Sequence, residues 1–344
     1  MDFYISQNSS LQRQFFHFRS KMMSLEYPLH IRSNIEGRIL EKYPLAALVQ
    51  AAETVSLRYR REAGGKGFQI QSEVEALSYL AARMPATYAA NAKVMSEVIR
   101  LYPDFRPESV LDVGAGPGTA SLCAVNQFET IKSSLLIEPN RYLKQSGRDF
   151  LSSFTSGFEW GESKVENLEL GRSFDLVLAS YVFNEIEKSN LNKLVEKIWS
   201  TCSKIMIIIE PGIPQGAGVI QSIRNWAIKS NISILAPCPQ VNECPLANTD
   251  SKWCHFSVRI SRSKLHKTLK GGDAGFEDEK FSYIVLSRER VTPPEYRLIG
   301  HPSGTKLREL QVCGKNGAET LKISKSNPSH KASKKLEWGD GFDG

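Results

Sequence analysis

The stretch Leu111–Gly118 reads Leu-Asp-Val-Gly-Ala-Gly-Pro-Gly and places three glycines at alternate positions directly after a short apolar run. Glycine lets a backbone turn sharply and lets a ligand approach it closely. Residues 110–113 predict a short strand before this turn, and residues 119–128 predict a helix after it. A strand, a glycine-rich turn and a helix in succession are typical of a nucleotide-binding turn at the edge of an open α/β sheet.

The residues that follow continue the alternation of strands and helices. Further strands are predicted at 134–137, 174–179 and 205–209, with a helix at 191–198. The unbroken apolar run at 205–209 is typical of a strand that is buried on both faces. Strands separated by helices indicate an α/β fold with a doubly wound, mainly parallel sheet.

The regions on either side of this core differ in pattern. Residues 36–102 have apolar positions at helical spacing, with a break at Gly64–Gly67, and Pro85 is placed to begin a helix at its first turn. We expect an ordinary helix, not an organelle transit peptide, in the first 24 residues. The sequence predicts five segments. They are a helical region (1–102), a Rossmann-like core (103–235), a cysteine-rich insertion (236–280), a last core strand with a small C-terminal β extension (281–323) and a basic flexible tail (324–344).

An acidic residue, Glu138, ends the strand that follows the glycine-rich turn. It lies 20 residues after Gly118, where a carboxylate is placed to accept hydrogen bonds from ribose hydroxyls. The glycine spacing differs from the Gly-x-Gly-x-x-Gly of dinucleotide sites. The form Asp-x-Gly-x-Gly-x-Gly resembles class I methyltransferases, which bind S-adenosylmethionine. The residues predicted to bind this cofactor are Asp112, Gly114, Gly116, Gly118 and Glu138.

Catalytic residues are not assigned by the sequence. The segment after the strand at 174–179 lacks the Asp/Asn-Pro-Pro-aromatic box of amino-group methyltransferases. Asn184 and Glu185 are the nearest candidates for a general base, and the start of a helix accounts for them better.

Charge and hydropathy narrow the range of partners. Apolar residues make up 41% of the 344 residues, and no run approaches the ~20 apolar residues of a membrane-spanning helix. The net charge of +7 favours an anionic partner. Two basic segments, 259–270 and 322–335, flank part of the cysteine region and favour contact with RNA phosphates, although a solvated charged face accounts for each of them alone equally well.

Four cysteines in the second half of the chain suggest a metal site: Cys238, Cys244, Cys254 and Cys313. Five and then nine residues separate the first three, which is looser than the pairs of most zinc sites. Loose spacing beside prolines suits an iron–sulfur cluster, and from spacing alone zinc and free buried thiols stay open. No secretory signal is evident, so a disulfide framework is not expected.

The remaining cysteines and a nearby histidine are expected to have ordinary structural roles. Cys123 and Cys202 are predicted to be buried structural thiols in a helix and at a strand edge. His255 is an alternative metal ligand, and its more ordinary role is a partly buried neighbour of Trp253.

Several stretches, in order along the chain, together resemble the methyltransferase-like small-ribosomal-subunit proteins of bacteria and mitochondria. They are Arg58–Arg60, Arg83–Tyr88, Leu111–Gly118, Glu210–Gly212, Ala236–Pro239, Trp253–His255, Gly300–Pro302, Val312–Cys313 and Lys334–Asp340.

This resemblance implies a methyltransferase-like fold that acts in assembly of the small ribosomal subunit near the mRNA channel, without robust catalysis. It implies a 4Fe-4S cluster held by Cys238, Cys244, Cys254 and Cys313. The expected partners are the small subunit and its rRNA, with no membrane and no DNA. The expected compartment is the cytoplasm of a bacterium, slightly favoured, or the mitochondrial matrix of a eukaryote. Two alternatives stay open: an active S-adenosylmethionine-dependent rRNA methyltransferase, and an iron or redox sensor that acts on translation.

Overall fold

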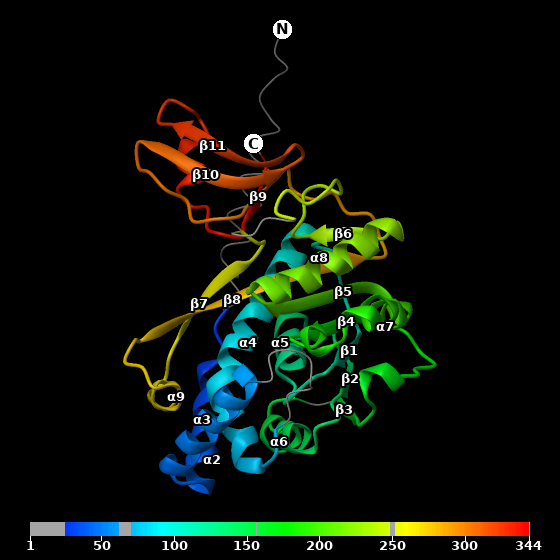
Figure 1. Cartoon of the computed structure of the whole chain (residues 1–344), viewed down its shortest axis with the longest axis vertical. Coiled ribbons are helices and arrows are strands. Elements are labelled where there is room, and N and C mark those ends of the chain that lie inside the picture. Colours follow the sequence, from blue (N-terminus) through cyan, green and yellow to red (C-terminus); the bar gives the residue numbers. More distant parts are fainter. Residues whose placement is uncertain (1–24, 62–69, 156, 248–251, 344) are drawn as a thin grey trace.

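A computed structural model describes residues 25–61, 70–155, 157–247 and 252–343 (Figure 1). The helix predicted in the first 24 residues and the predicted break at Gly64–Gly67 lie outside this range.

The main sheet has eight strands and confirms the predicted doubly wound α/β fold. Its order is β3-β2-β1-β4-β5-β8-β6, with β7 paired to β8 beyond this path. Strands β3, β2, β1, β4 and β5 pair in parallel, whereas β8 is antiparallel to its neighbours β5, β6 and β7. The strands are β1 (Ser109–Val113), β2 (Ser133–Ile137), β3 (Phe158–Gly161), β4 (Phe174–Ser180), β5 (Cys202–Pro211), β6 (Ser233–Ala236), β7 (Phe256–Ser261) and β8 (Phe276–Ser287).

Helices cover both faces of this sheet, and each face has its own apolar core. In β5, Ile205, Ile207 and Ile209 face one core and Met206 and Ile208 face the other, so the run is buried on both sides as predicted. The first core is completed by α2 (Leu29–Lys42), α4 (Glu73–Leu101), α5 (Thr119–Gln127) and α6 (Arg141–Leu151). The second is completed by α7 (Lys188–Ser200) and α8 (Pro214–Lys229), with the short turns η1 (Val165–Asn167) and η2 (Phe183–Glu185).

The longest helix, α4, differs from the sequence prediction. Pro85 lies inside this 29-residue helix and does not begin one. The helix instead starts at Glu73, where the Ser72 hydroxyl caps it by accepting a hydrogen bond from the Glu75 amide. Its alanine-rich surface packs against α5, β7, β8 and the preceding helix α3 (Leu45–Arg61), and this tertiary packing outweighs the local cost of the proline.

The cysteine-rich insertion is more regular than its composition indicates. The sequence predicts no strand or helix within the insertion at 236–280, yet it contains β7 and the helix α9 (Lys264–Lys270). Because β8 is twelve residues long, its second half completes the main sheet while its first half pairs with β7. We call β7, α9 and the first half of β8 the arm; it packs on α3 and α4 (Figure 1).

A second, four-stranded sheet lies beyond the β6 edge of the main sheet (Figure 1). Its order is β11-β10-β9-β12, built from β9 (Tyr296–Leu298), β10 (Leu307–Gly314), β11 (Gly317–Ser324) and β12 (Gly341–Phe342). Residues 324–344 were expected to form a flexible tail. They instead contain α10 (His330–Ser333) and β12, which pairs with β9, so the chain folds back onto this sheet.

None of the helices in the described residues has the length and apolar composition needed to cross a membrane.

Candidate cofactor sites

The glycine-rich turn joins β1 to α5 and requires glycine at three positions. Gly114, Gly116 and Gly118 have φ angles of 67°, 57° and 87°, in the left-handed region that other residues rarely adopt. A Cβ atom on Gly114 would lie 2.6 Å from the Val182 side chain, which follows β4. A Cβ atom on Gly116 would meet no atom within 4 Å. The turn is therefore packed at its start and open at its middle glycine, where a ligand has room to contact the backbone.

Glu138 holds the middle of this turn in place. One carboxylate oxygen accepts a hydrogen bond from the Gly116 amide (2.8 Å), and the other accepts one from the Asn140 amide (2.7 Å). Burial of this side chain raises its pKa to about 7, although both amide hydrogen bonds favour the charged form. The sequence predicted that Glu138 binds a ribose. The structure shows a contact with the turn itself, and ribose binding stays a prediction.

Asp112 anchors the other side of the turn. Its Oδ2 atom accepts hydrogen bonds from the Ser121 amide (3.1 Å) and hydroxyl (2.7 Å), so it ties the end of β1 to the first turns of α5. Its Oδ1 atom has no hydrogen-bond partner among the described residues. Burial raises the pKa of Asp112 to about 6. The chemistry of the turn fits an adenosyl ligand: open backbone at Gly116 beside carboxylates that can accept hydrogen bonds.

Two further carboxylates, Glu210 and Glu185, lie at or just after the carboxyl ends of the central strands. Neither of them was among the residues predicted from the sequence to bind the cofactor. Glu210, at the end of β5, is fully buried and accepts hydrogen bonds from the Phe183 (2.8 Å) and Asn184 (3.2 Å) amides. Burial raises its pKa to about 8. Glu185 lies in η2, and burial followed by the charge of Glu138 raises its pKa to about 7. The sequence does contain a signal for Glu210, because it is a single acid directly after the apolar run at 205–209.

The segment after β4 is held in a strained conformation beside these acids. Tyr181 has a φ of 63°, which is uncommon for a residue with a side chain. Its hydroxyl donates to Glu279 of β8 (2.9 Å), and Glu279 also pairs with Arg83 of α4 (3.2 Å). These contacts join the arm and the N-terminal helices to the edge of the sheet where the glycine-rich turn lies.

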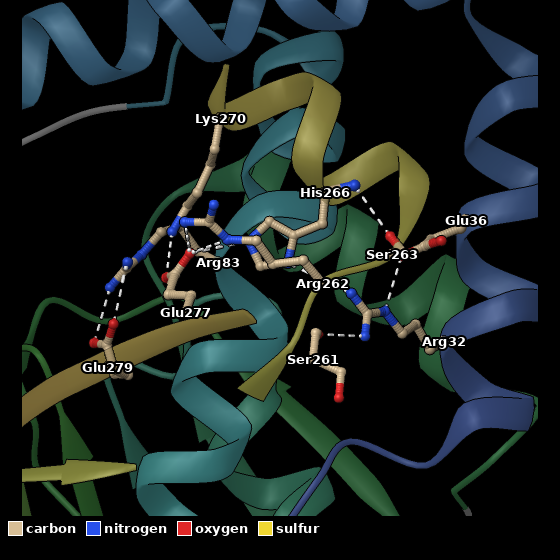
Figure 2. A network of polar contacts seen from close by, with 10 residues as sticks. All are labelled: Arg32, Glu36, Arg83, Ser261, Arg262, Ser263, His266, Lys270, Glu277 and Glu279. Atoms are coloured by element: carbon tan, nitrogen blue, oxygen red, sulfur yellow. Dashed lines mark hydrogen bonds and ion pairs between the residues drawn. The ribbon is translucent and has the colours of Figure 1, made fainter. Parts of the chain in front are cut away.

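Charged side chains join the parts of the arm to one another and link the arm to α2 and α4, and Figure 2 shows this network. Glu277 of β8 accepts hydrogen bonds from Arg262 (2.7 Å) and Lys270 (2.5 Å), and His266 lies 3.5 Å away. Arg32 of α2 donates to the Ser261 carbonyl oxygen (2.9 Å).

The network changes the expected role of the basic segment 259–270. Three of its five charged side chains form ion pairs within the fold: Arg262 and Lys270 share Glu277, and Arg259 pairs with Asp278. Lys264 and Lys267 form no ion pair with the described residues, so they are the charges of this segment that remain for a partner. In the second basic segment, Lys325, Lys331 and Lys334 are exposed.

The structure brings the four predicted cysteine ligands together at one cavity. Cys238 follows β6, Cys244 lies in the next loop, Cys254 precedes β7 and Cys313 lies in β10 of the second sheet. All four line the same cavity, with Arg224, Arg297 and the prolines that flank Cys238 among its other walls. Residues that are distant in sequence therefore meet where the two sheets join.

The dimensions of the cavity bear on what it could hold. Its volume is about 30 Å³, which is more than the roughly 10–15 Å³ that one water molecule needs. Among the described residues, no group of three or more His, Cys, Asp or Glu side chains is placed to hold a metal ion. Four thiols around one cavity nevertheless form the donor set that iron–sulfur clusters use, and the ligand assignment stays a prediction.

The remaining thiols and His255 occupy the predicted positions. Cys123 in α5 and Cys202 in β5 are buried, as expected of structural thiols. His255 stacks on Trp253, with ring centroids 5.4 Å apart, and its ring also meets Trp338 at 4.8 Å. His255 does not line the cysteine cavity. It therefore packs between the main sheet and the C-terminal segment.

Comparison with solved structures finds methyltransferases among the similar chains. One is magnesium protoporphyrin IX methyltransferase from Synechocystis with bound S-adenosylmethionine, at a TM-score of 0.39 and 11% identity over 68% of this chain and 91% of that chain.

Two curated relatives share more sequence. Rsm22-cox11 tandem protein 2, mitochondrial, from Schizosaccharomyces pombe is 27% identical over 64% of this chain and 33% of its own length. The human ribosome assembly protein METTL17, mitochondrial, is 24% identical over 79% of this chain and 64% of its own length. The chain thus spans a third of the yeast protein and less than two thirds of the human one.

A family model covers most of the chain. The model described as mitochondrial small ribosomal subunit Rsm22 matches residues 73–343, from the start of α4 to the end of the second sheet. This range includes the glycine-rich turn and all four cysteines of the cavity. The resemblance drawn from the motifs is confirmed, and the chain belongs to the Rsm22 family of the mitochondrial small ribosomal subunit.

Proposed function

We propose that this chain is an assembly factor of the small ribosomal subunit, built on a methyltransferase fold and carrying a 4Fe-4S cluster. Membership of the Rsm22 family is the observation that carries the assembly role, and the name of the human relative supports it. The proposal includes binding of small-subunit rRNA near the mRNA channel without robust catalysis.

Cys238, Cys244, Cys254 and Cys313 would hold the cluster. Their common cavity supports this assignment. When bound, the cluster would supply a rigid cross-link between the loop after β6, the start of β7 and β10. Binding would also draw Cys313 and the second sheet onto the main sheet, which gives the cluster a structural role.

Phosphate contacts would come from basic side chains that form no ion pair with the residues that the structure describes. Lys264 and Lys267 on α9, with Lys325, Lys331 and Lys334 near the C-terminus, are the candidates. For a eukaryotic host we propose the mitochondrial matrix, which the names of the relatives support. The bacterial cytoplasm is the alternative compartment.

A second candidate function is methyl transfer to rRNA. The observation in its favour is the turn at Gly114–Gly118, with three left-handed glycines, an open middle position and the supporting carboxylate of Glu138. The acids at this edge would also attract the positively charged sulfonium of S-adenosylmethionine. The residues that we propose to bind it are Asp112, Gly114, Gly116, Gly118 and Glu138.

Complementation of a deletion strain separates these functions. We expect wild-type protein and Gly116→Arg protein to restore small subunits on a sucrose gradient, whereas Cys313→Ser protein does not. Gly116 is chosen because its Cβ position is open, so the arginine fills the ligand side of the turn without a steric clash. Its φ of 57° strains any side chain placed there, so circular dichroism has to show that this variant folds. Loss of function in Gly116→Arg protein, with an rRNA methyl group missing by mass spectrometry, would favour the methyltransferase instead.

The cluster is tested on purified protein. Protein purified without oxygen should be brown and contain about four irons per chain. Colourless protein that binds no iron after reconstitution with iron and sulfide would refute the cluster and leave the assembly role intact.

A further inference from the structure

Arg224 of α8 is a buried cation that points at the cysteine cavity. Its side chain is 3% exposed, and its Nε atom donates to the Cys238 sulfur at 3.4 Å. Its Nη2 atom donates to the carbonyl oxygens of Gln240 (3.1 Å) and Asn242 (2.7 Å) in the loop before Cys244. No carboxylate of the described residues pairs with it. The positive charge of Arg224 therefore has no counter-charge in the part of the chain that the structure describes.

Arg297 is a second buried cation at the same cavity. It lies in β9 directly across from Cys313 of β10, and its side chain is 1% exposed. Its Nε atom donates to the Pro237 carbonyl oxygen (2.8 Å), and its Nη1 atom pairs with Glu97 (2.5 Å). Its Nη2 atom is buried and has no hydrogen-bond partner among the described residues.

Within the described part of the chain, the charges around the cavity do not balance. Glu97 is the carboxylate that pairs with Arg297, and it also pairs with Arg100 (2.8 Å). Arg100 is 37% exposed and its charge is solvated, whereas Arg297 and Arg224 are buried, and among the described residues Glu97 is the one carboxylate that pairs with either of these two. A buried cation without a counter-charge costs several kcal/mol, on the order of what removal of one partner from a buried ion pair costs. Neutral thiols supply no negative charge, so these arginines require an anionic occupant.

We infer that Arg224 and Arg297 are the counter-charges of the metal centre in this cavity, and that Arg224 raises its reduction potential. The inference rests on the cluster proposed above. A 4Fe-4S core bound by four thiolates has a net negative charge, which grows by one on reduction. A cation that donates a hydrogen bond to a ligand sulfur stabilises the more negative state, and hydrogen bonds and net charge are known determinants of cluster potentials.

The variant Arg224→Met tests this because it keeps much of the length of the side chain and removes the charge. We expect its cluster to have a more negative midpoint potential in a dithionite titration followed by electron paramagnetic resonance. Its cluster should also be lost faster in air. Arg224→Lys keeps the charge and loses the forked donor geometry of the guanidinium. The midpoint potential of its cluster should lie between those of Arg224→Met and wild type.

Arg288→Met is the matched control. Arg288 also donates to two backbone carbonyl oxygens, those of Cys202 (2.9 Å) and Trp199 (2.8 Å), and it does not line the cavity. The potential of this variant should equal that of wild type. Far-ultraviolet circular dichroism checks that each variant folds. Arg224→Lys is the variant that decides the question if Arg224→Met does not fold.

A second readout separates the charge effect from a structural role. The Arg224→Met change should lower the urea midpoint more in cluster-loaded protein than in metal-free protein, because the charge interacts with the cluster only when it is bound. Equal losses in both forms, with an unchanged potential, would overturn the inference while the cluster stands. A wild-type protein that cannot be loaded with any metal would overturn both the cluster and the inference.

Discussion

At the scale of single residues, the glycine-rich turn owes its shape to Gly114. A side chain there has to adopt a φ of 67° and would bring Cβ to 2.6 Å from Val182. We expect Gly114→Ala to lower the free energy of unfolding by about 1–3 kcal/mol, measured by urea denaturation. Gly218→Ala is the control, since Gly218 lies in α8 with no atom near its Cβ position, and it should be neutral or stabilising by about 0.5–1 kcal/mol. Equal stabilities of the two variants would contradict this account.

Glu210 should make the stability of the folded protein decrease as the pH rises. Its pKa in the folded protein is raised to about 8, above the ordinary value of 4.5, so between these values the folded state binds more protons than the unfolded state. The stability that Glu210 contributes is therefore fully present below pH 4.5 and is lost as the pH rises through about 8. Glu210→Gln should flatten the fall in melting temperature between pH 5 and pH 8 relative to wild type. The exposed Glu196→Gln serves as control, and an identical slope in all three proteins would refute the prediction.

At the scale of elements, the arm depends on Glu277. This side chain is 10% exposed and bonds Arg262 and Lys270, so its removal leaves two cations without their partner. Glu277→Gln should destabilise the protein by about 3–5 kcal/mol in urea denaturation and increase hydrogen exchange in α9. The neighbouring substitution Asp278→Asn breaks the ion pair between Asp278 and Arg259, whose side chains are 39% and 64% exposed, respectively. Because this pair is exposed, the substitution should change the free energy of unfolding by no more than about 1 kcal/mol. A small effect of Glu277→Gln would show that contacts other than those of Glu277 hold α9 within the arm.

The elements also show which parts of this fold a sequence can reveal. Local patterns were sufficient for the strand at 205–209, because a short unbroken run of apolar residues, rich in β-branched side chains, favours a buried strand. They were also sufficient for the strand at 174–179, whose apolar run is interrupted by Asp175 alone. They failed at Pro85, where long-range packing along α4 outweighs a local signal. They failed again at β7 and α9, whose alternating and capped patterns are short and polar, and which are regular because they pair with β8 and dock on the helices.

In the candidate sites, too, the sequence predicts some features and misses others that depend on long-range packing. The glycines of the turn could be predicted, because left-handed backbone demands a particular residue. The grouping of the four cysteines around one cavity could also be predicted, through the family resemblance. Arg224 could not, because an arginine in an amphipathic helix normally faces water. Its burial depends on the loop that folds over it from residues 240–242.

At the scale of the whole molecule, polar contacts among the described residues help to join the second sheet to the rest of the fold. Arg297 of β9 binds Glu97 of α4, and Lys93 of α4 pairs with Asp340 just before β12 (3.2 Å). The cysteine cavity is the third link, since Cys313 belongs to the second sheet while the other three cysteines belong to segments that continue into the main sheet. A metal centre there would therefore determine how firmly the second sheet is held.

Removal of the metal should accordingly loosen the second sheet and leave the main sheet intact. We expect hydrogen exchange of β9–β11 to increase when a chelator strips cluster-loaded protein, while β1, β4 and β5 keep their protection, because the latter are buried between two helical layers. Cys313→Ser should show the exchange pattern of stripped protein from the start. Cys123→Ser, at a buried thiol in α5, should keep its iron and the protected second sheet. If stripping and Cys313→Ser both leave β9–β11 protected, the ion pairs of Arg297 and Lys93 are sufficient to hold the sheets together, and the cluster has no structural role.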